Sequence, residues 1–311
     1  MRKLLPAALI NFLRQAKNLL RRAKLKLASH KGSAAYWTSH MVANDNWLDA
    51  KDSLDHFLWR NAQYPGYIEL MPVQEAGQLT VMDYGCGPGN DLVGFQEFSK
   101  PTSLIGVDVS KTALEVARRR LDLHGGVGVE LLFIEEDSNR IHLPDNTIDL
   151  AHSSGVLHHV KNIELAIKEI RRVIKPGGKL QVMVYNYNSL WLHLYTAYIH
   201  KIEKGVYRDL NLLDAFRHTT DGPECPVSHC YRPSEFLQLV CSAGFSGKFR
   251  GSSISIKELG LLPKRFDAIR NRELASEHRD FLSSLTFDEK GHPYFEGNVA
   301  GINACYEFTK I

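Results

Sequence analysis

The chain has 311 residues, 44% of them hydrophobic, so it can bury the core of one enlarged domain or of one domain with an inserted cap. The formal net charge of +3 is unevenly distributed: residues 1–44 hold nine Lys or Arg and no acid, and the rest holds 29 basic against 35 acidic residues. This mildly acidic body argues against nucleic-acid binding. Five scattered cysteines are unlike a disulfide framework and favour a reducing, cytoplasmic compartment.

Residues 1–32 form the first predicted unit, a basic amphipathic helical arm. Apolar side chains from Leu5 to Leu27 recur at steps of three and four, and basic side chains follow the same rhythm on another face. The longest uncharged run, 4–13, has ten residues. A bilayer span needs roughly 20. We therefore expect an arm that lies on an anionic membrane surface, packs on the body, mediates an oligomer contact or serves as a transit peptide; the pattern does not select an oligomeric state.

Residues 33–72 are irregular and rich in aromatic side chains, with Tyr36 and Trp37 at the start. Such a segment can fold over a bound cofactor as a lid, although aromatic side chains more often serve as core packing. Tyr36 with Trp37 and the stretch 56–65 resemble the elements that precede the sheet in methyltransferases of sugar and surface-glycan pathways.

The next segment carries the strongest motif of the chain. A predicted strand over 80–83 leads into Gly85-Cys86-Gly87-Pro88-Gly89, and a second strand over 104–109 contains Asp108, nineteen residues past the last glycine. Glycines let a backbone approach a ligand closely, and an acid at this distance accepts both ribose hydroxyls of an adenosine-bearing cofactor. A dinucleotide site would place its third glycine at Asn90. The spacing found here resembles motif I of class I S-adenosylmethionine (SAM) methyltransferases.

Beyond Asp108 the chain keeps alternating helix and strand, as a doubly wound parallel sheet requires. We predict a helix over 111–124 and strands over 129–134 and 148–153.

The turn Glu135-Glu136-Asp137-Ser138 joins the last two strands. In class I methyltransferases the acid at this place reaches the adenine amino group, and the next backbone amide reaches a ring nitrogen. The resemblance implies these roles for Asp137 and Ser138. Glu135 or Glu136 could replace Asp137, and a solvated acidic turn is the simpler alternative.

Two further motifs follow: residues 153–160, Ser-Ser-Gly-Val-Leu-His-His-Val, and Lys175-Pro176-Gly177-Gly178 before a fifth strand. Their order resembles the methyltransferase type 11 (UbiE-like) group of class I SAM methyltransferases over about residues 81–185. The resemblance implies SAM as cofactor and a Rossmann-like, doubly wound α/β fold whose seven-stranded sheet has an antiparallel last strand. The residues that it implies for SAM binding are Asp83, Gly85, Cys86, Gly87, Gly89, Asp108, Val109, Asp137, Ser138 and Ser153.

The carboxyl-terminal third is less regular. We predict that residues 186–232 form a cap inserted into a methyltransferase domain that spans 33–311. A helix over 234–243, a charged helical segment over 264–285 and strands over 249–256 and 302–309 complete the prediction. Cys225, His229 and Cys230 lack a second pair of ligands at a usual spacing, so no metal site is assigned.

Methyl transfer to an oxygen nucleophile needs a group that removes a proton, and imidazole suits this role near neutral pH. His158 follows the fourth strand at the edge where ligands of such sheets bind, so we take it as the candidate base. A structural histidine is the alternative, and His193, His218, Tyr185 and Tyr187 are competitors.

We therefore predict a SAM-dependent methyltransferase that acts on a small-molecule or glycan acceptor at oxygen. The alternatives are a nucleotide-dependent oxidoreductase and a non-catalytic SAM-binding partner protein.

Overall fold

The computed structural model describes residues 32–41, 47–126 and 128–311. All but the last residue of the predicted arm lies outside the described residues. Within them, no helix combines the length and the apolar character needed to cross a membrane.

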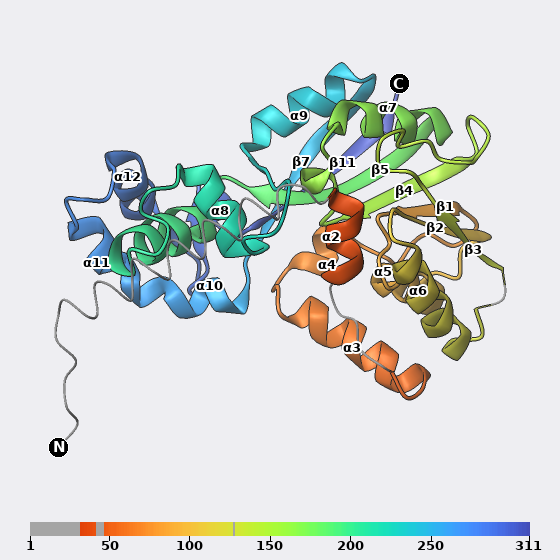
Figure 1. Cartoon of the computed structure of the whole chain (residues 1–311), viewed down its shortest axis with the longest axis horizontal. Helices are drawn as coiled ribbons and strands as arrows, with labels where there is room; N and C mark the ends of the chain where they lie inside the picture. Colours follow the sequence, from red (N-terminus) through yellow and green to blue (C-terminus); the bar gives the residue numbers. More distant parts are fainter. Residues whose placement is uncertain (1–31, 42–46, 127) are drawn as a thin grey trace.

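One twisted sheet organises the fold (Figure 1). Its strands follow the order β3-β2-β1-β4-β5-β11-β7, and the two-residue β6 adds to β5. The pairs from β3 to β5 are parallel, whereas β11 runs antiparallel to both β5 and β7. The predicted doubly wound sheet with an antiparallel last strand is thus confirmed. The strands are β1 (Thr80–Tyr84), β2 (Ser103–Asp108), β3 (Val129–Phe133), β4 (Ile148–Ser154), β5 (Ile174–Asn186), β6 (Cys230–Tyr231), β7 (Phe245–Ser253) and β11 (Asn303–Lys310).

Helices cover both faces of the sheet, because successive side chains of a strand point to opposite sides. Val81 of β1 joins a core with α3, α5 and α6, and the next residue, Met82, joins a second core with α7 and α9. The helices are α3 (Ala50–Ala62), α4 (Tyr67–Leu70), α5 (Asn90–Phe98), α6 (Lys111–Leu123), α7 (Ile163–Val173) and α9 (Pro233–Ser242). Ser110 and Asn162 accept a backbone hydrogen bond at the first turns of α6 and α7, so polar caps fix where these two helices begin.

A separate helical layer lies at the end of the molecule away from α5 and α6 (Figure 1). The predicted cap, 186–232, supplies η2 (Trp191–Glu203), which has π-type hydrogen bonding, and α8 (Leu212–Thr220). A second segment after β7 packs on η2 through buried side chains such as Ile254, Phe281 and Leu282. It contains α10 (Ile256–Leu261), η3 (Leu262–Lys264), α11 (Arg265–Arg270), α12 (Ser276–Ser284) and a small antiparallel sheet of β8 (Thr286–Phe287), β9 (Pro293–Phe295) and β10 (Asn298–Val299).

Local chain geometry explains two differences from the predicted elements. The strand expected over 249–256 begins at Phe245, because Gly244 with φ +89° turns the chain directly out of α9, and it ends at Ser253 before Ser255 caps α10. The helical segment expected over 264–285 is divided, since Asn271 leaves the helical conformation with ψ 117°.

Candidate active site

A cavity of about 600 Å³ lies at the carboxyl ends of the parallel strands. Its walls come from the ends of β1, β2, β4 and β5, the segments that follow β1 to β4, α2 (Ser33–Ser39), residues 60–67, residues 220–221 and the start of β11. Ligands of doubly wound sheets bind at this edge, where the strand order reverses. Strand β1 lies between β2 and β4, so the turn that follows β1 stands at the reversal point.

The glycine turn forms the floor of the cavity. Gly85, Cys86 and Gly87 line it, whereas Gly89 lies behind them as the N-cap of α5 with φ +81°. At Gly85, φ is +80° and a Cβ would come within 2.3 Å of the Val156 side chain. A Cβ on Gly87 would meet nothing within 4 Å. The backbone of the turn is therefore open to a ligand.

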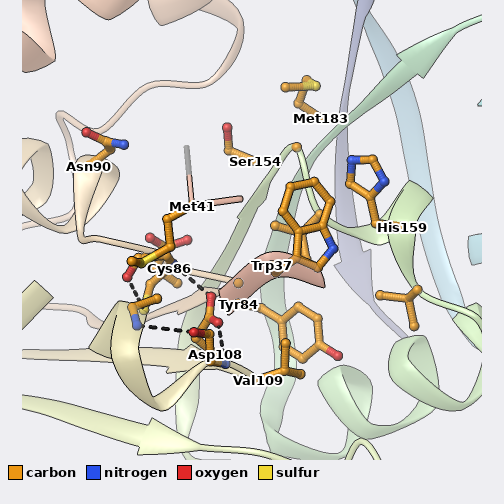
Figure 2. Close-up of a pocket in the computed structure, with 18 of the residues that line it drawn as sticks. Trp37, Met41, Tyr84, Cys86, Asn90, Asp108, Val109, Ser154, His159 and Met183 are labelled. Atoms are coloured by element: carbon orange, nitrogen blue, oxygen red, sulfur yellow. Dashed lines mark hydrogen bonds between the residues drawn. The ribbon is translucent and has the colours of Figure 1, made fainter. Parts of the chain in front are cut away.

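Asp108 ends β2 and points toward this turn, beside Cys86 in Figure 2. Its carboxylate accepts the Gly87 N–H at 2.9 Å on one oxygen and the Ser110 N–H at 2.8 Å on the other. Burial raises the pKa of Asp108, and these backbone hydrogen bonds oppose the rise. Each oxygen keeps acceptor capacity and Asp108 lines the cavity, so the carboxylate can accept two adjacent hydroxyls, as a ribose presents them.

The wall after β3 differs from the expected adenine contact. Ile134, Glu136 and Asn139 line the cavity, whereas Asp137 and Ser138 are exposed and do not line it. Asn139 adopts φ +49°, and the turn aims residues 136 and 139 inward. Glu136, which the motif left as an alternative, is thus the acid at this wall.

Helix α2 forms part of the cavity wall, next to the segment that follows β3. The Glu136 carboxylate accepts the backbone N–H groups of Ser33 at 3.0 Å and Ala34 at 2.8 Å, which are otherwise unpaired at a helix start. Tyr36 and Trp37 line the cavity, so the aromatic segment contributes to the cavity wall as well as to core packing.

Comparison with known proteins agrees with this geometry. The family model "Methyltransferase domain" matches residues 82–182, the part of the chain that holds the glycine turn and β1 to β5. Residues 82–182 therefore match a methyltransferase domain.

The curated relatives align with less than half of this chain. An uncharacterised 37.1 kDa protein of transposon TN4556 from Streptomyces fradiae is 35% identical over 46% of this chain and 37% of its own length. The ubiquinone/menaquinone biosynthesis C-methyltransferase UbiE of Pseudomonas entomophila is 32% identical over 46% of this chain and 54% of its own length. The chain thus spans about half, or less, of the curated relatives that it matches.

A solved structure supports the fold. The YcgJ protein of Bacillus subtilis aligns with a TM-score of 0.50 at 18% identity, over 82% of this chain and 98% of that one. At this identity the likeness concerns the fold alone.

A largely buried ionic network joins Arg60, Asp91 and His152. The Arg60 guanidinium contacts Asp91 at 2.7 Å, and the other Asp91 oxygen lies 3.4 Å from Nε2 of His152. Although burial would raise the pKa of Asp91, Arg60 and His152 bring it below its usual value. Burial raises the pKa of Asp83, at the end of β1, to about 7, with His152 opposing the rise. Arg60, Asp83 and Asp91 all line the cavity.

Of the two serines at the end of β4, the predicted contact Ser153 does not line the cavity and its neighbour Ser154 does. Ser153 is fully buried and donates to the Tyr84 carbonyl oxygen at 3.1 Å, outside the cavity. Ser154 points the other way and lines it, hydrogen-bonded to the Tyr67 hydroxyl. Alternation along β4 is the reason, because residues one apart face opposite sides of a sheet.

The two histidines after β4 have different surroundings. His158 is 0% exposed, does not line the cavity, and among the described residues neither of its ring nitrogens has a hydrogen-bond partner. Burial holds the pKa of His158 well below its usual value. His159 lines the cavity, and its ring lies against Trp37 with centroids 4.6 Å apart (Figure 2). The structure thus places the candidate base His158 in the core and presents His159 instead.

The cap adds one acid that the sequence prediction did not select. Asp221 follows α8, lines the cavity, and accepts the Tyr185 hydroxyl at 2.8 Å and the Ser228 hydroxyl at 2.7 Å. Its backbone oxygen accepts the hydroxyl of Tyr36. The signal in the sequence is weak, because an acid in Thr-Thr-Asp-Gly-Pro looks like an ordinary turn.

The other competitors lie elsewhere. His193 pairs with His278 of α12 at 2.9 Å, and Tyr187 donates to Glu277. His218 is buried beside Tyr207.

A possible metal set also differs from the one considered in the sequence. Within the described residues, the structure groups Cys225 with His159 and Asp221, whose donor atoms lie within 4.8 Å of one another. His229 and Cys230 are not part of this group. Cys225 already donates to the Val227 carbonyl oxygen at 3.2 Å, so its thiol is satisfied without a metal ion.

Proposed function

We propose that this protein transfers the methyl group of SAM to a hydroxyl oxygen of a small-molecule or glycan acceptor. One observation carries the proposal: a single cavity is lined by Asp108 and the glycine turn and also by His159 and Asp221. A donor held at the first set would share an enclosed space with an acceptor held at the second.

The residues present suit SAM. Asp108 would accept the ribose hydroxyls, and Val109 and Ile134 offer apolar contacts for a flat base next to it. SAM supplies a methyl group on a positively charged sulfur, which the acceptor displaces in line. The protein then has to align the two reactants and exclude water, and helix α2 with Tyr36 and Trp37 is placed to do so.

The lining favours a small acceptor over a polymer with many phosphates. Tyr64, Tyr185 and Met183 provide apolar surface, and Asp221 adds an acidic group. The Lys and Arg residues that line the cavity, among those described, are Arg60 and Lys161, and Arg60 is paired with Asp91. The name of the UbiE relative states a carbon acceptor. Carbon methylation is therefore the second candidate.

Calorimetry tests the cofactor assignment. We expect the purified protein to bind SAM and S-adenosylhomocysteine and not NAD. Binding of NAD in place of SAM would support the oxidoreductase alternative and overturn the proposal.

A labelled-methyl assay tests the reaction. Protein, methyl-labelled SAM and a fractionated metabolite extract are incubated, and labelled products are tested for an oxygen-linked or a carbon-linked methyl group. Oxygen-linked label supports the proposal and carbon-linked label supports the second candidate. SAM binding without any labelled product would support a non-catalytic role.

We also propose a cytoplasmic protein whose residues 1–30 contact an anionic membrane surface. The support is the cluster of basic residues in a segment without acids, on a chain whose body is mildly acidic.

A further inference from the structure

Hydrogen bonding to the backbone fixes the state of the His159 ring. Nδ1 of His159 lies 2.8 Å from the carbonyl oxygen of Val227. A carbonyl oxygen can only accept, so Nδ1 must carry a proton and, in the neutral ring, Nε2 carries a lone pair. Nε2 is the atom that lies 3.8 Å from Oδ1 of Asp221.

The Asp221 carboxylate is held in place on both oxygens. The hydroxyls of Tyr185 and Ser228 donate to Oδ1 and Oδ2, and the carboxylate is 8% exposed. Among the described residues, its one basic partner within ion-pair distance is His159. The Nε2 lone pair of His159 thus lies near the negatively charged Oδ1 of Asp221. Because this charge stabilises a positively charged ring, it favours the uptake of a proton on Nε2.

We propose that His159 and Asp221 act together as the proton acceptor for the methyl-accepting hydroxyl; this inference rests on the proposed function. The hydroxyl proton moves to Nε2 of His159 while the acceptor oxygen bonds to the methyl carbon. The carbon–sulfur bond breaks, and its electron pair stays on sulfur. The imidazolium, with Nε2–H beside Asp221 and Nδ1–H on Val227, later releases the proton to water.

The surroundings of His159 keep the ring neutral before reaction. Burial lowers the pKa of His159, Asp221 and the Val227 carbonyl oppose this, and His229 lowers it further. A neutral ring is the form that can accept a proton. The titratable groups around the ring are Asp221, His158, His229, Cys225, Tyr36 and Tyr185.

The first test reads the histidine ring directly. Protein labelled with ¹⁵N-histidine is titrated by long-range ¹H–¹⁵N correlation, and His159→Gln identifies the signals. We expect the Nδ1-protonated form at pH 7.5, a pKa of His159 below that of a free histidine, and a further fall in Asp221→Asn. A matched control, His229→Gln, should raise the pKa of His159, because it removes a neighbouring positive charge.

Two results of this titration would overturn the inference. One is an Nε2-protonated ring, and the other is a pKa that does not change in Asp221→Asn. Stoichiometric zinc in the purified protein, lost in Cys225→Ser, would assign His159, Asp221 and Cys225 to a metal site and would also overturn it.

The second test separates the inference from the proposed function. In the labelled-methyl assay we expect His159→Gln to lower transfer by about 10²–10⁴-fold, the usual range for loss of a general base, with SAM affinity unchanged. A wild-type protein that transfers no methyl group overturns the proposed function. A His159→Gln variant with the wild-type rate overturns the inference about His159 alone.

Discussion

The cavity has a proposed cofactor side, around Asp108 and the glycine turn, and a proposed acceptor side, around His159 and Asp221. The two sides are built in different ways. The cofactor side comes from the ends of adjacent strands: the backbone N–H groups of Gly87 and Ser110 position Asp108. The acceptor side is assembled from distant segments, where Tyr36 of α2 and Tyr185 of β5 meet Asp221 of the cap. A short, contiguous motif can therefore specify the cofactor, whereas the acceptor depends on tertiary contacts.

The sharpest way to break the cofactor side is Asp108→Ala. The variant loses the carboxylate that would accept two ribose hydroxyls, and hydrogen bonds to a charged group contribute about 1.5–3 kcal/mol each, so SAM affinity should fall by roughly 100-fold or more. Calorimetry measures it. Asp122→Ala, an exposed acid on α6, is the control that should bind like the wild type, and an unchanged affinity in Asp108→Ala would contradict the assignment.

A second change tests the turn itself. At Gly85 a side chain would adopt positive φ and meet Val156, so Gly85→Ala should destabilise the fold by about 2–4 kcal/mol and distort the cofactor floor. Urea unfolding measures the loss. Gly125→Ala, also at positive φ but in open space, should cost less. Equal losses in the two variants would show that the contact with Val156 is unimportant.

These differences explain what the sequence could predict. The strand–turn–helix pattern around Gly85 and the interval to Asp108 depend on local backbone geometry, and the structure has both as expected. Which of two neighbours faces inward depends on the phase of a strand or turn. For that reason Ser154 replaces Ser153 at the cavity wall.

The acceptor side could not be predicted in the same way. Asp221 reaches the cavity because α8 packs on η2, a contact without a fixed sequence interval. Likewise the cap recruits residues after β7, and nothing local in that segment indicates its partner.

A smaller effect distinguishes the two acids after β3. Glu136→Gln should weaken SAM binding by about 1 kcal/mol, because the charge at the start of α2 is lost and α2 is held less firmly at the cavity wall. Asp137→Asn, at an exposed position, should stay within about 0.5 kcal/mol of the wild type. Calorimetry on the pair measures the difference. The opposite ranking would restore the adenine contact expected from the motif.

The pH dependence of the free energy of unfolding tests whether His158 is a neutral, buried ring. The pKa of His158 is depressed in the folded state, so the unfolded chain binds more protons below about pH 6.5, and stability falls as pH drops from there toward the folded pKa. His158→Leu removes this contribution, so its free energy of unfolding should fall less between pH 7 and pH 5 than that of the wild type. Urea midpoints at both pH values give the answer, and identical pH dependence in both proteins would argue against a neutral buried ring.

The smallest effect on SAM is expected from deleting residues 1–30. SAM affinity should not change, but binding to vesicles with anionic phosphatidylserine should be lost, because the segment carries eight Lys or Arg. Co-sedimentation with anionic and with neutral vesicles measures the loss. Retained binding to anionic vesicles would refute the membrane role of the arm.

The most direct test of the whole account is a crystal structure with S-adenosylhomocysteine bound. The account predicts both ribose hydroxyls on the Asp108 carboxylate, and the sulfur facing the part of the cavity lined by His159 and Asp221. A ligand bound elsewhere, or a sulfur directed away from His159, would contradict it.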